Sequence, residues 1–394
     1  MSINKQNILL LCKVVDNFGD IGVVYRLSKA LSDERPSLNL TLVVSNLESF
    51  SAMADEINPE KKIQDFKYKD STWKILSWNL DMNIPEEKEA ARKAADENQI
   101  VLECFQCGRP DWLENILFCD DFTKTVQIVN IDYLTAEDYA DDFHLLRSGT
   151  RKTCIKKINF MPGFTSKTGG LIFSEEAVPR LLPLQKSQEK ADFKISFFAY
   201  EKNFVPVINA ISHFQDEKRK TKKDFFVRVF VAAGKSRTPF IDAWEKCGKP
   251  FKITELPFLP QEDWDYLLTQ MNFNFVRGED SLSRAALSGL PYVWNAYIQD
   301  DDYQLVKVDA LLERMRPFFD ENDFNLLKNV WDSYNKESED AKEISKTEQE
   351  LYEFLLRACD SGKMQSSFKN YSASIKKNGN LAQHLLNYLD GLDC

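Results

Sequence analysis

The sequence predicts an α/β fold made of two successive domains, each built around a parallel sheet. Short apolar runs alternate with stretches of helical spacing, and this alternation occurs twice along the chain. A polar segment with two prolines, residues 174–192, separates the two series. The alternation is typical of βαβ units, because parallel strands need a long crossover connection that is usually a helix. A chain of 394 residues has room for two such domains at roughly 150 residues each.

The first series begins with residues 7–15, NILLLCKVV, which are mostly apolar and too few for a helix. Such a run is typical of a strand buried on both faces of a parallel sheet. Residues 22–34 carry Val23, Leu27 and Leu31 at helical spacing, which predicts the first helix. Further strands of this series are predicted over 38–45, 99–103 and 125–130. Strand, helix and strand in this order predict a doubly wound sheet.

The second series predicts strands over 194–200, 225–232, 251–256 and 272–276, with helices between them. We therefore expect an N-terminal domain over residues 1–178 and a C-terminal domain over 190–375. Leucines at 381, 385, 386 and 389 predict an amphipathic helix in the last stretch, 376–394. This helix could pack on either domain, and we assign it to the first. In open sheets of this kind, ligands bind beyond the carboxyl ends of the strands.

The charge balance excludes some classes of function. The chain has 51 Lys and Arg against 61 Asp and Glu, a net charge of −10. This argues against a nucleic-acid binder or a binder of anionic membranes, because phosphate contacts need clustered cations. The short basic run Lys218–Lys223 is interpreted as a solvated loop. No signal-peptide pattern and no apolar run of membrane-spanning length occur, so we expect a cytoplasmic protein.

The first candidate site is the loop VDNFGDIG, residues 15–22, directly after the first strand. Its two glycines permit a tight turn, and Asp16 and Asp20 stand where a reactive group would be expected. The loop lacks the GxGxxG fingerprint of dinucleotide-binding folds. An alternative remains open, in which either aspartate only accepts hydrogen bonds from the first amides of the helix.

The second candidate site is the segment FVRGEDSLSR, residues 275–284, which follows a strand of the second series. We expect Asp280 or Ser281 to cap a helix over 282–287, whose free amides would attract an anion. Arg277 suits bidentate contact with a phosphate, so a diphosphate is a natural ligand. The alternative is a capped helix with a surface pair of Arg277 and Glu279.

Weaker signals carry less. Asp263-Trp264-Asp265 has the DxD pattern of metal-nucleotide sites, but it lies within a predicted helix, 261–270, and is interpreted as helix surface. The one CxxC, Cys104 to Cys107, has no second pair nearby, which favours structural thiols. Phe258 lies in the loop 256–261, where a core position and a position lining a cleft are equally expected.

Taken together, several segments resemble the bacterial protein-arginine rhamnosyltransferases that modify elongation factor P. The matching stretches are VVDNFGDIGV (14–23), NIDYLTAEDY (130–139), MPGFTSKTGGL (161–171), FFAYE (197–201), LPFLPQEDWDYLL (256–268), FVRGEDSLSRA (275–285) and PYVWNAYIQ (291–299). The resemblance implies a GT-B fold with two Rossmann-like domains facing a central cleft. It implies that the first domain binds the acceptor and the second binds the nucleotide sugar. The implied reaction is inverting transfer of rhamnose from dTDP-β-L-rhamnose to an arginine of elongation factor P, in the cytoplasm and without a metal or other cofactor.

The resemblance also assigns roles to residues. Asp20 corresponds to the general base, Asp16 to its supporting carboxylate, and Glu279 to a further catalytic residue. The residues implied to bind substrate are Asn17, Phe18, Gly19, Tyr200, Phe258, Gln261, Arg277, Asp280, Ser281 and Tyr297. Two positions depart from the family pattern. The family usually has proline where Ile298 stands and histidine where Gln304 aligns, so the loop after Tyr297 is the least secure part of the correspondence.

The residue types fit the implied chemistry. A guanidinium is a weak nucleophile because its lone pairs are delocalised, so an acceptor arginine needs a carboxylate such as Asp20 to orient it and take its proton. A departing diphosphate needs cationic groups such as Arg277. Two alternatives stay open: a GT-B transferase with another acceptor, and a non-catalytic protein that binds elongation factor P. The paired Asp16 and Asp20 favour catalysis.

Overall fold

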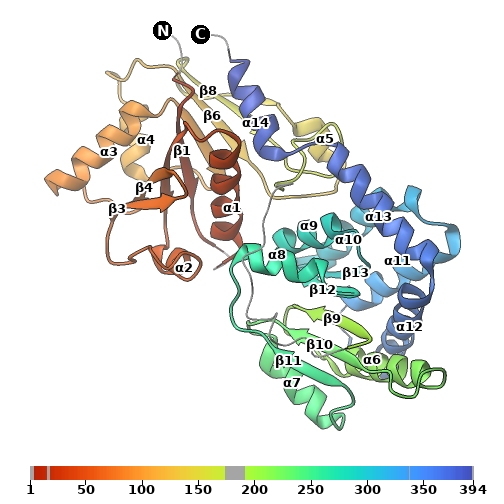
Figure 1. Ribbon diagram of the computed structural model, residues 1–394. Helices are drawn as coiled ribbons and strands as arrows, with labels where there is room; N and C mark the ends of the chain where they lie inside the picture. The colour runs from red at the N-terminus through yellow and green to blue at the C-terminus, as the bar shows by residue number, and fades with distance from the viewer. Residues whose placement is uncertain (1–3, 16–17, 174–190, 337, 393–394) are drawn as a thin grey trace. The chain divides into compact units, whose positions relative to one another are not determined.

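The computed structural model describes residues 4–15, 18–173, 191–336 and 338–392 (Figure 1). The chain divides into two compact units, Met1–Glu175 together with Asn378–Cys394, and Glu176–Lys377. Within the described ranges, no helix combines the length and apolarity that a membrane crossing needs. Most of the segment interpreted as a linker, 174–192, lies outside the described residues.

The first unit is built on an eight-stranded sheet in the order β3-β4-β2-β1-β5-β6-β8-β7. Its strands are β1 Asn7–Cys12, β2 Asn39–Val44, β3 Ile63–Tyr68, β4 Ser71–Ser77, β5 Ile100–Cys104, β6 Val126–Ile131, β7 Arg147–Ser148 and β8 Ile155–Phe160. The six central strands, from β4 to β8, run parallel, whereas β3 and β7 pair antiparallel at the two edges. The four predicted strands are confirmed as β1, β2, β5 and β6, although β1 ends at Cys12 and not at Val15.

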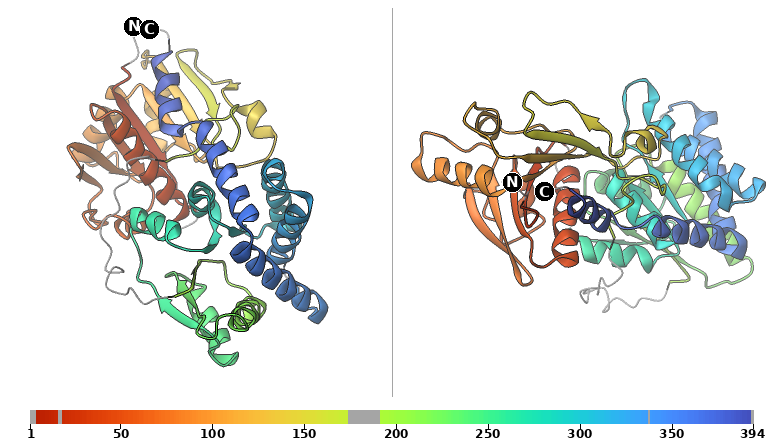
Figure 2. Two further views of the ribbon diagram at one scale, coloured as in Figure 1. Left: turned by 45° about the vertical axis from the view of Figure 1, so that its right-hand side comes forward. Right: turned by 90° about the horizontal axis from the view of Figure 1, so that it is seen from above.

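Helices pack on this sheet, and one of them comes from the C-terminal end of the chain. They are α1 Gly19–Glu34, α2 Leu47–Ser51, α3 Pro85–Glu97, α4 Asp111–Leu117, α5 Tyr139–Phe143 and α14 Leu381–Asp390. The predicted amphipathic helix at the end of the chain is confirmed as α14. It lies beside α1 (Figure 2), and Arg35 at the end of α1 pairs with Asp390 at 2.6 Å.

The leucine face of α14 is part of the core of the first unit. Leu381, Leu385 and Leu389 are fully buried in one cluster with Ile8 of β1 and Leu27 of α1. Burial of each leucine is worth about 1.5–3 kcal/mol, which holds α14 in place. The chain enters α14 by a close backbone approach: a Cβ on Gly170 would lie 2.3 Å from the carbonyl oxygen of Gly379.

The second unit has a five-stranded parallel sheet in the order β11-β10-β9-β12-β13. Its strands are β9 Phe193–Phe197, β10 Val227–Val231, β11 Lys252–Glu255, β12 Phe273–Arg277 and β13 Tyr292–Asn295. The four predicted strands are confirmed as β9 to β12, each within three residues of its predicted bounds. The helices are α6 Val205–Arg219, α7 Arg237–Lys246, α8 Gln261–Thr269, α9 Gly278–Ser288, α10 Tyr303–Met315, α11 Glu321–Asn335, α12 Ala341–Asp360 and α13 Gly362–Lys377.

The basic run differs from its interpretation as a loop, because Lys218 and Arg219 form the last turn of α6. Its charges are matched by acids: Lys218 pairs with Asp360 at 2.5 Å and Lys220 pairs with Glu217 at 2.6 Å. Acids therefore already neutralise part of the charge that this run could offer to a phosphate.

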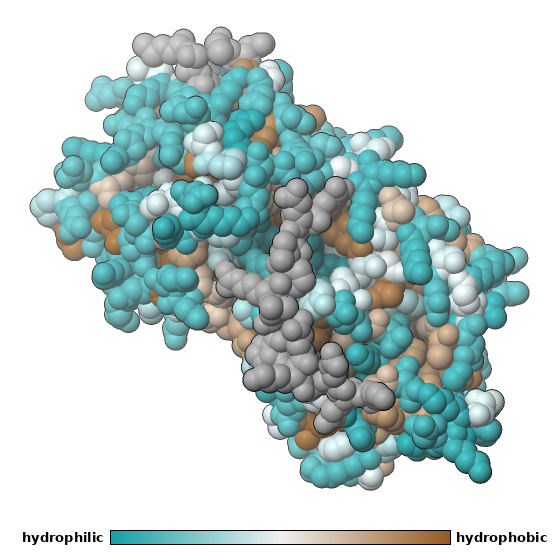
Figure 3. All heavy atoms as spheres, viewed as in Figure 1, coloured by the Kyte–Doolittle hydropathy of each residue, from teal (hydrophilic) through white to brown (hydrophobic). Residues whose placement is uncertain are grey.

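The face drawn in Figure 3 is largely hydrophilic, and its hydrophobic side chains stand in small separate groups. Among the large hydrophobic side chains that are exposed, several belong to loops that sequence analysis assigned to the site, namely Val15, Phe18, Phe258, Tyr297 and Ile298. Exposed aromatic side chains in loops at strand ends are a common feature of binding sites.

Candidate active site

In the first unit, three loops leave the sheet at the same edge. The strands β1, β5 and β6 are parallel neighbours that end at Cys12, Cys104 and Ile131. The loops that follow them therefore meet beyond the carboxyl ends of the strands, where ligands bind in sheets of this type.

Asp20 lies at this edge, in the first turn of α1, and only 2% of its surface is exposed. Its Oδ2 accepts a hydrogen bond from the backbone N–H of Val15 at 2.7 Å. Its Oδ1 accepts one from the hydroxyl of Tyr133, in the loop after β6, at 3.0 Å. Both donors lie outside α1, so the carboxylate links the loop after β1 to the loop after β6. A residue that only caps a helix would instead accept hydrogen bonds from the first amides of that helix. The position at a helix N-terminus also favours a negative charge.

The neighbours of Asp20 in the predicted loop are only partly described. Asp16 and Asn17 lie outside the described residues. Phe18 and Gly19 are exposed where α1 begins, next to the buried Asp20. The structure thus places one buried carboxylate beside exposed backbone and an exposed ring, an arrangement that can receive a polar side chain of another molecule.

In the second unit, Arg277 ends β12 between two aromatic rings. Its guanidinium carbon lies 4.5 Å from the centre of the Phe198 ring and 4.6 Å from the centre of the Tyr200 ring. Both rings follow β9, the neighbour of β12 in the sheet. Stacking of this kind uses the faces of the planar guanidinium and holds it in one orientation.

The helix after Arg277 starts earlier than predicted. It begins at Gly278, so Asp280 and Ser281 lie inside its first turn and the prediction that either one caps it is wrong. The reason is Gly278, whose φ of +65° lets the strand turn directly into the helix without a loop. The first amides of α9 therefore follow Arg277 at once. Helix amides next to a guanidinium form a ready site for an anion.

The next three residues, Glu279, Asp280 and Ser281, differ in their contacts and in their burial. Glu279 pairs with Lys307 of α10 at 3.8 Å. This contact differs from the alternative interpretation, which pairs Glu279 with Arg277. Asp280 is half-buried, and Ser281 is buried with 7% exposed. The three residues thus line the first turn of α9 at different depths.

Tyr200 and Tyr297 meet edge to face, with 5.3 Å between ring centres. Tyr200 also donates its backbone N–H to the side-chain oxygen of Asn295, at the end of β13, at 2.9 Å. Tyr297 is 55% exposed. The structure therefore brings Tyr200, Tyr297 and Arg277 together at the carboxyl edge of β9, β12 and β13.

The loop between β11 and α8 leads into a helix that contacts Phe198, one of the rings beside Arg277. Trp264 of α8 lies 5.5 Å from Phe198, the ring that stacks on Arg277. Gln261 is the first residue of α8, and Phe258 is half-exposed in the loop before it. The exposure of Phe258 contradicts the core alternative, and its place in the lining of a cleft stays a prediction.

Within the DxD segment, Asp263 is buried, so its interpretation as helix surface is wrong. The segment does lie in a helix, α8, as predicted. Among the residues that the structure describes, no group of three His, Cys, Asp or Glu side chains is arranged to hold a metal ion.

The CxxC cysteines lie near the first site but have little thiolate character. Burial is the main cause that raises the pKa of the Cys107 thiol to about 11, and it raises the pKa of Cys104 well above its ordinary value. Because the thiolate is the reactive form, both are poor nucleophiles at neutral pH. This agrees with the interpretation as structural thiols.

Sequence reasoning missed two residues of the first site. Tyr133, which binds Asp20, lies in the stretch 130–139 of the family resemblance but received no role there, and Phe105 stacks on Tyr133. Both stand two or three residues beyond a predicted strand, and this position is the signal that could have found them.

The loop after Tyr297, where the chain departs from the family pattern, is held by Gln304. This side chain is buried, and its oxygen accepts the backbone N–H of Gln299 at 3.1 Å. Its amide nitrogen donates to Asp302 at 3.1 Å. Gln304 thus shapes the loop, whereas Ile298 is exposed in it.

Comparison with known proteins agrees with this architecture. A family model described as Elongation-Factor P (EF-P) rhamnosyltransferase EarP matches residues 8–390. A protein-arginine rhamnosyltransferase of Shewanella oneidensis is 30% identical over 357 residues, which are 83% of each chain. The enzyme of the same name from Pseudomonas putida is 28% identical over 350 residues, 83% of this chain and 86% of its own.

Solved structures show the fold. The structure behind EarP-mediated arginine glycosylation of EF-P has a TM-score of 0.55 at 20% identity, and covers 98% of this chain and 99% of its own. Spinosyn rhamnosyltransferase SpnG has a TM-score of 0.53 at 9% identity, with 98% and 100% covered. These likenesses confirm the predicted α/β fold of GT-B type. Because the family model extends over nearly the whole sequence, the chain belongs to the EarP family of elongation factor P rhamnosyltransferases.

Proposed function

We propose that the protein is an inverting protein-arginine rhamnosyltransferase that transfers rhamnose from dTDP-β-L-rhamnose to an arginine of elongation factor P. Membership of the EarP family and the names of the curated relatives support this reaction. The structural observation that carries the proposal is the buried Asp20 carboxylate, held by two hydrogen bonds at the carboxyl edge of the first sheet. The acceptor is a translation factor, so the reaction belongs in the cytoplasm.

On the acceptor side, Asp20 acts as the general base in this proposal. The carboxylate accepts a hydrogen bond from the arginine and favours localisation of its positive charge. A guanidinium nitrogen then attacks the anomeric carbon of rhamnose, the bond from that carbon to the diphosphate breaks, and the proton of the nitrogen passes to Asp20. One displacement of this kind inverts the anomeric centre. Asp16, although outside the described residues, is proposed to support the same carboxylate, and Asn17, Phe18 and Gly19 to bound the acceptor.

On the donor side, Arg277 and the first amides of α9 are proposed to bind the diphosphate of dTDP. They stabilise the charge that develops as it leaves, so the reaction needs no metal ion. Glu279, Asp280 and Ser281 are proposed to contact the sugar and the diphosphate. Phe258 and Gln261 are proposed to recognise the thymine, and Tyr200 and Tyr297 to lie beside the sugar. The stacking of Arg277 between two rings and the start of α9 at Gly278 support this assignment.

The test is the intact mass of elongation factor P after incubation with the protein and dTDP-β-L-rhamnose, with and without EDTA. We expect one rhamnosyl increment on an arginine, unaffected by EDTA. Asp20→Asn is expected to lower turnover at least ~10²-fold, the scale of general-base catalysis, while dTDP still binds. Asp142→Asn is the matched control, an exposed aspartate of the same unit that should keep wild-type turnover.

The remaining outcomes separate the alternatives. Consumption of dTDP-β-L-rhamnose without an increment on elongation factor P would indicate another acceptor. Binding of elongation factor P with no consumption of the nucleotide sugar would indicate a non-catalytic binding protein. Wild-type turnover in Asp20→Asn would overturn the role of Asp20.

A further inference from the structure

We propose that Tyr133, held by the ring of Phe105, is a positioning residue that fixes the orientation of the Asp20 carboxylate for rhamnosyl transfer. The inference rests on the function proposed above, because it concerns the geometry of the general base. It adds to that function two aromatic residues and a buried ionic network that hold the base from outside its own loop.

First, the two hydrogen bonds to Asp20 described above come from different parts of the chain. The donor to Oδ2 is the Val15 amide, which belongs to the same loop as Asp20. The donor to Oδ1 is the Tyr133 hydroxyl, 113 residues away in the sequence. Together the two bonds fix both oxygens of one carboxylate and therefore its rotation about the bond to Cβ. Without the hydroxyl, Oδ1 of Asp20 would lose its bond to the loop after β6.

The second step is the support of the Tyr133 ring. Tyr133 is 43% exposed, so burial alone does not hold its side chain. Its ring stacks on Phe105 with 4.4 Å between centres and 18° between planes. Its backbone N–H donates to Oδ1 of Asp132 at 2.8 Å, and Oδ2 of the same carboxylate accepts from the amide of Gln106 at 2.9 Å. The loops after β5 and β6 are thus joined by a ring contact and by a bridging carboxylate.

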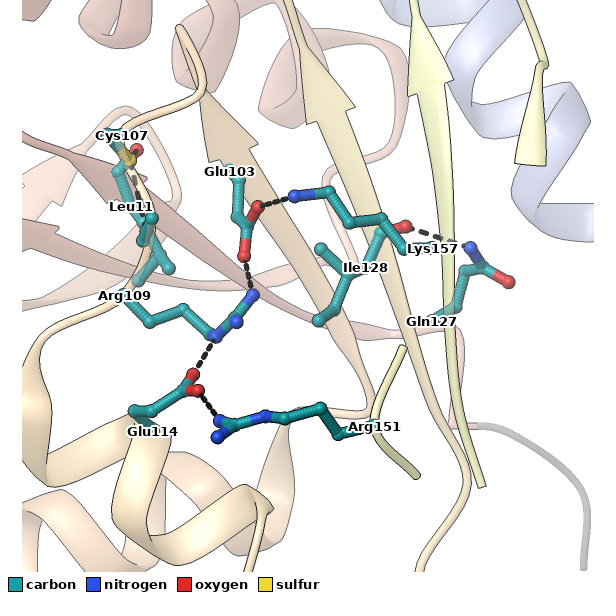
Figure 4. A network of polar contacts seen from close by, with 10 residues as sticks. Leu11, Glu103, Cys107, Arg109, Glu114, Gln127, Ile128, Arg151 and Lys157 are labelled. Carbon is teal, nitrogen blue, oxygen red and sulfur yellow. Dashed lines mark hydrogen bonds and ion pairs between the residues drawn. The ribbon is translucent and has the colours of Figure 1, made fainter. Parts of the chain in front are cut away.

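The third step is the anchoring of the loop that carries Phe105. Phe105 and Gln106 have positive φ values of 61° and 53°, which residues with a side chain seldom adopt, so surrounding contacts must hold this loop. The Phe105 amide donates to the Ile131 carbonyl at 2.6 Å. Figure 4 shows the other anchor: Glu103, fully buried before the loop, bonds Arg109 after it. The ion pair closes the loop at its base.

The same network ties the loop to the rest of the sheet. Lys157 of β8 donates to the second oxygen of Glu103 at 2.5 Å, and Arg109 also pairs with Glu114 of α4 at 2.6 Å. A connected path therefore leads from the buried Glu103 and its two partly buried cations through Phe105 and Tyr133 to Asp20. Positioning of a reacting group matters because a displacement of about 1 Å can cost on the order of 10²-fold in rate.

The experiment is steady-state kinetics of Tyr133→Phe, which removes the hydroxyl and keeps the stacked ring. We expect kcat to fall roughly 10- to 100-fold, while KM for elongation factor P and the affinity for dTDP stay at wild-type values. Loss of one hydrogen bond to a buried carboxylate should lower the thermal midpoint slightly. Tyr139→Phe is the control, because Tyr139 is a tyrosine of the same unit with 42% exposure, matched to the 43% of Tyr133. A wild-type kcat in Tyr133→Phe would overturn the proposal, as would a loss explained entirely by KM.

Phe105 is tested by a pair of substitutions. Phe105→Leu removes the stacked ring and should lower kcat as Tyr133→Phe does, whereas Phe105→Tyr keeps a ring and should restore most of it. Equal rates in the two variants would show that the ring contact is not what holds Tyr133.

A double-mutant cycle separates this inference from the proposed function. If Asp20 is the base and Tyr133 acts through it, Tyr133→Phe should cause no further loss in the Asp20→Asn background. Inactive Asp20→Asn with wild-type Tyr133→Phe would leave the proposed function standing and overturn the positioning role alone. Wild-type turnover in Asp20→Asn would overturn both.

Discussion

The guanidinium carbon of Arg277 lies 4.6 Å from the centre of the Tyr200 ring. The two residues come from the ends of neighbouring strands, β12 and β9, so the contact is set by the sheet itself. The ring uses the face of the guanidinium, whereas phosphate recognition uses the N–H groups at its edge. One arginine can therefore be held by Tyr200 and still bind a diphosphate.

Arg277→Lys and Arg277→Ala should both weaken binding of dTDP. Lysine keeps the charge but loses the planar fork, so we expect roughly 10-fold weaker binding, and alanine loses both and should cost about 100-fold. Isothermal titration with dTDP measures the change. The control is Arg316→Lys, an arginine of the same unit paired with Glu313 at 2.7 Å. Equal affinities of Arg277→Ala and the wild type would refute the phosphate role.

Gly278→Ala should damage the nucleotide site. Gly278 has a φ of +65°, where a side chain costs about 1–2 kcal/mol, and relief of this strain would move the first amides of α9. The new Cβ itself would only make an ordinary van der Waals contact with the Tyr200 hydroxyl oxygen, at 3.5 Å. We expect a lower thermal midpoint together with weaker dTDP binding. Gly248→Ala is the matched control, since its φ is +81° but nothing lies within 4 Å of a Cβ there. It should lower the midpoint by a similar amount and leave dTDP affinity unchanged, and loss of affinity in both variants would contradict the prediction.

Glu103→Gln should strongly destabilise the fold. The carboxylate is fully buried and bonds both Arg109 and Lys157, so its loss takes this partner from Lys157 and leaves Arg109 with Glu114 alone. Breaking a buried ionic group in this way costs about 3–5 kcal/mol of the free energy of unfolding. Urea denaturation measures it.

Asp65→Asn is the comparison for that variant. Asp65 pairs with Lys74 at 3.1 Å, but its side chain is 66% exposed. Removing an exposed pair costs about 0–1 kcal/mol. Equal losses of unfolding free energy in the two variants would show that burial of Glu103 is not the reason why its ion pairs stabilise the fold.

Most of the central strands were predicted from the sequence because they are short and mostly apolar. NILLLC of β1 and VRVFV of β10 are buried along their whole length apart from one end residue of β1. The edge strand β3 escaped prediction for the opposite reason: half of the residues of IQDFKY are polar and only Phe66 is buried. The helices α10 to α13 were not assigned either, since no strand pattern delimits them.

Apart from the family resemblance, the site was predicted mainly from charged residues and their positions after strands. Asp20 and Arg277 stand out as charged residues at strand ends, and the structure places each at a carboxyl edge. Tyr133 and Phe105 are aromatic residues without a spacing signal. Their contact with Asp20 depends on the sheet order β1-β5-β6, and periodicity alone does not give the order of strands.

His144 should make stability fall in mild acid. Burial, the main cause, and the nearby His384 lower the pKa of His144 from 6.5 to about 4, against a raising effect of Asp141. Its Nδ1 accepts the Met161 amide at 3.1 Å, which requires the neutral ring.

The sign of the effect follows from proton binding. Between pH 6.5 and about 4 the unfolded chain binds a proton at His144 that the folded chain does not, so the free energy of unfolding decreases as pH falls through this window. Because the ring is partly exposed, solvent screening reduces the effect to about 1 kcal/mol. Thermal midpoints at pH 7 and pH 5 measure it.

His144→Gln keeps an acceptor for the Met161 amide but cannot titrate, so its midpoint should fall less than that of the wild type. His213→Gln, at a histidine that is 59% exposed and belongs to the second unit, should keep the wild-type slope. A slope in His144→Gln identical to the wild type would place the acid sensitivity in other groups.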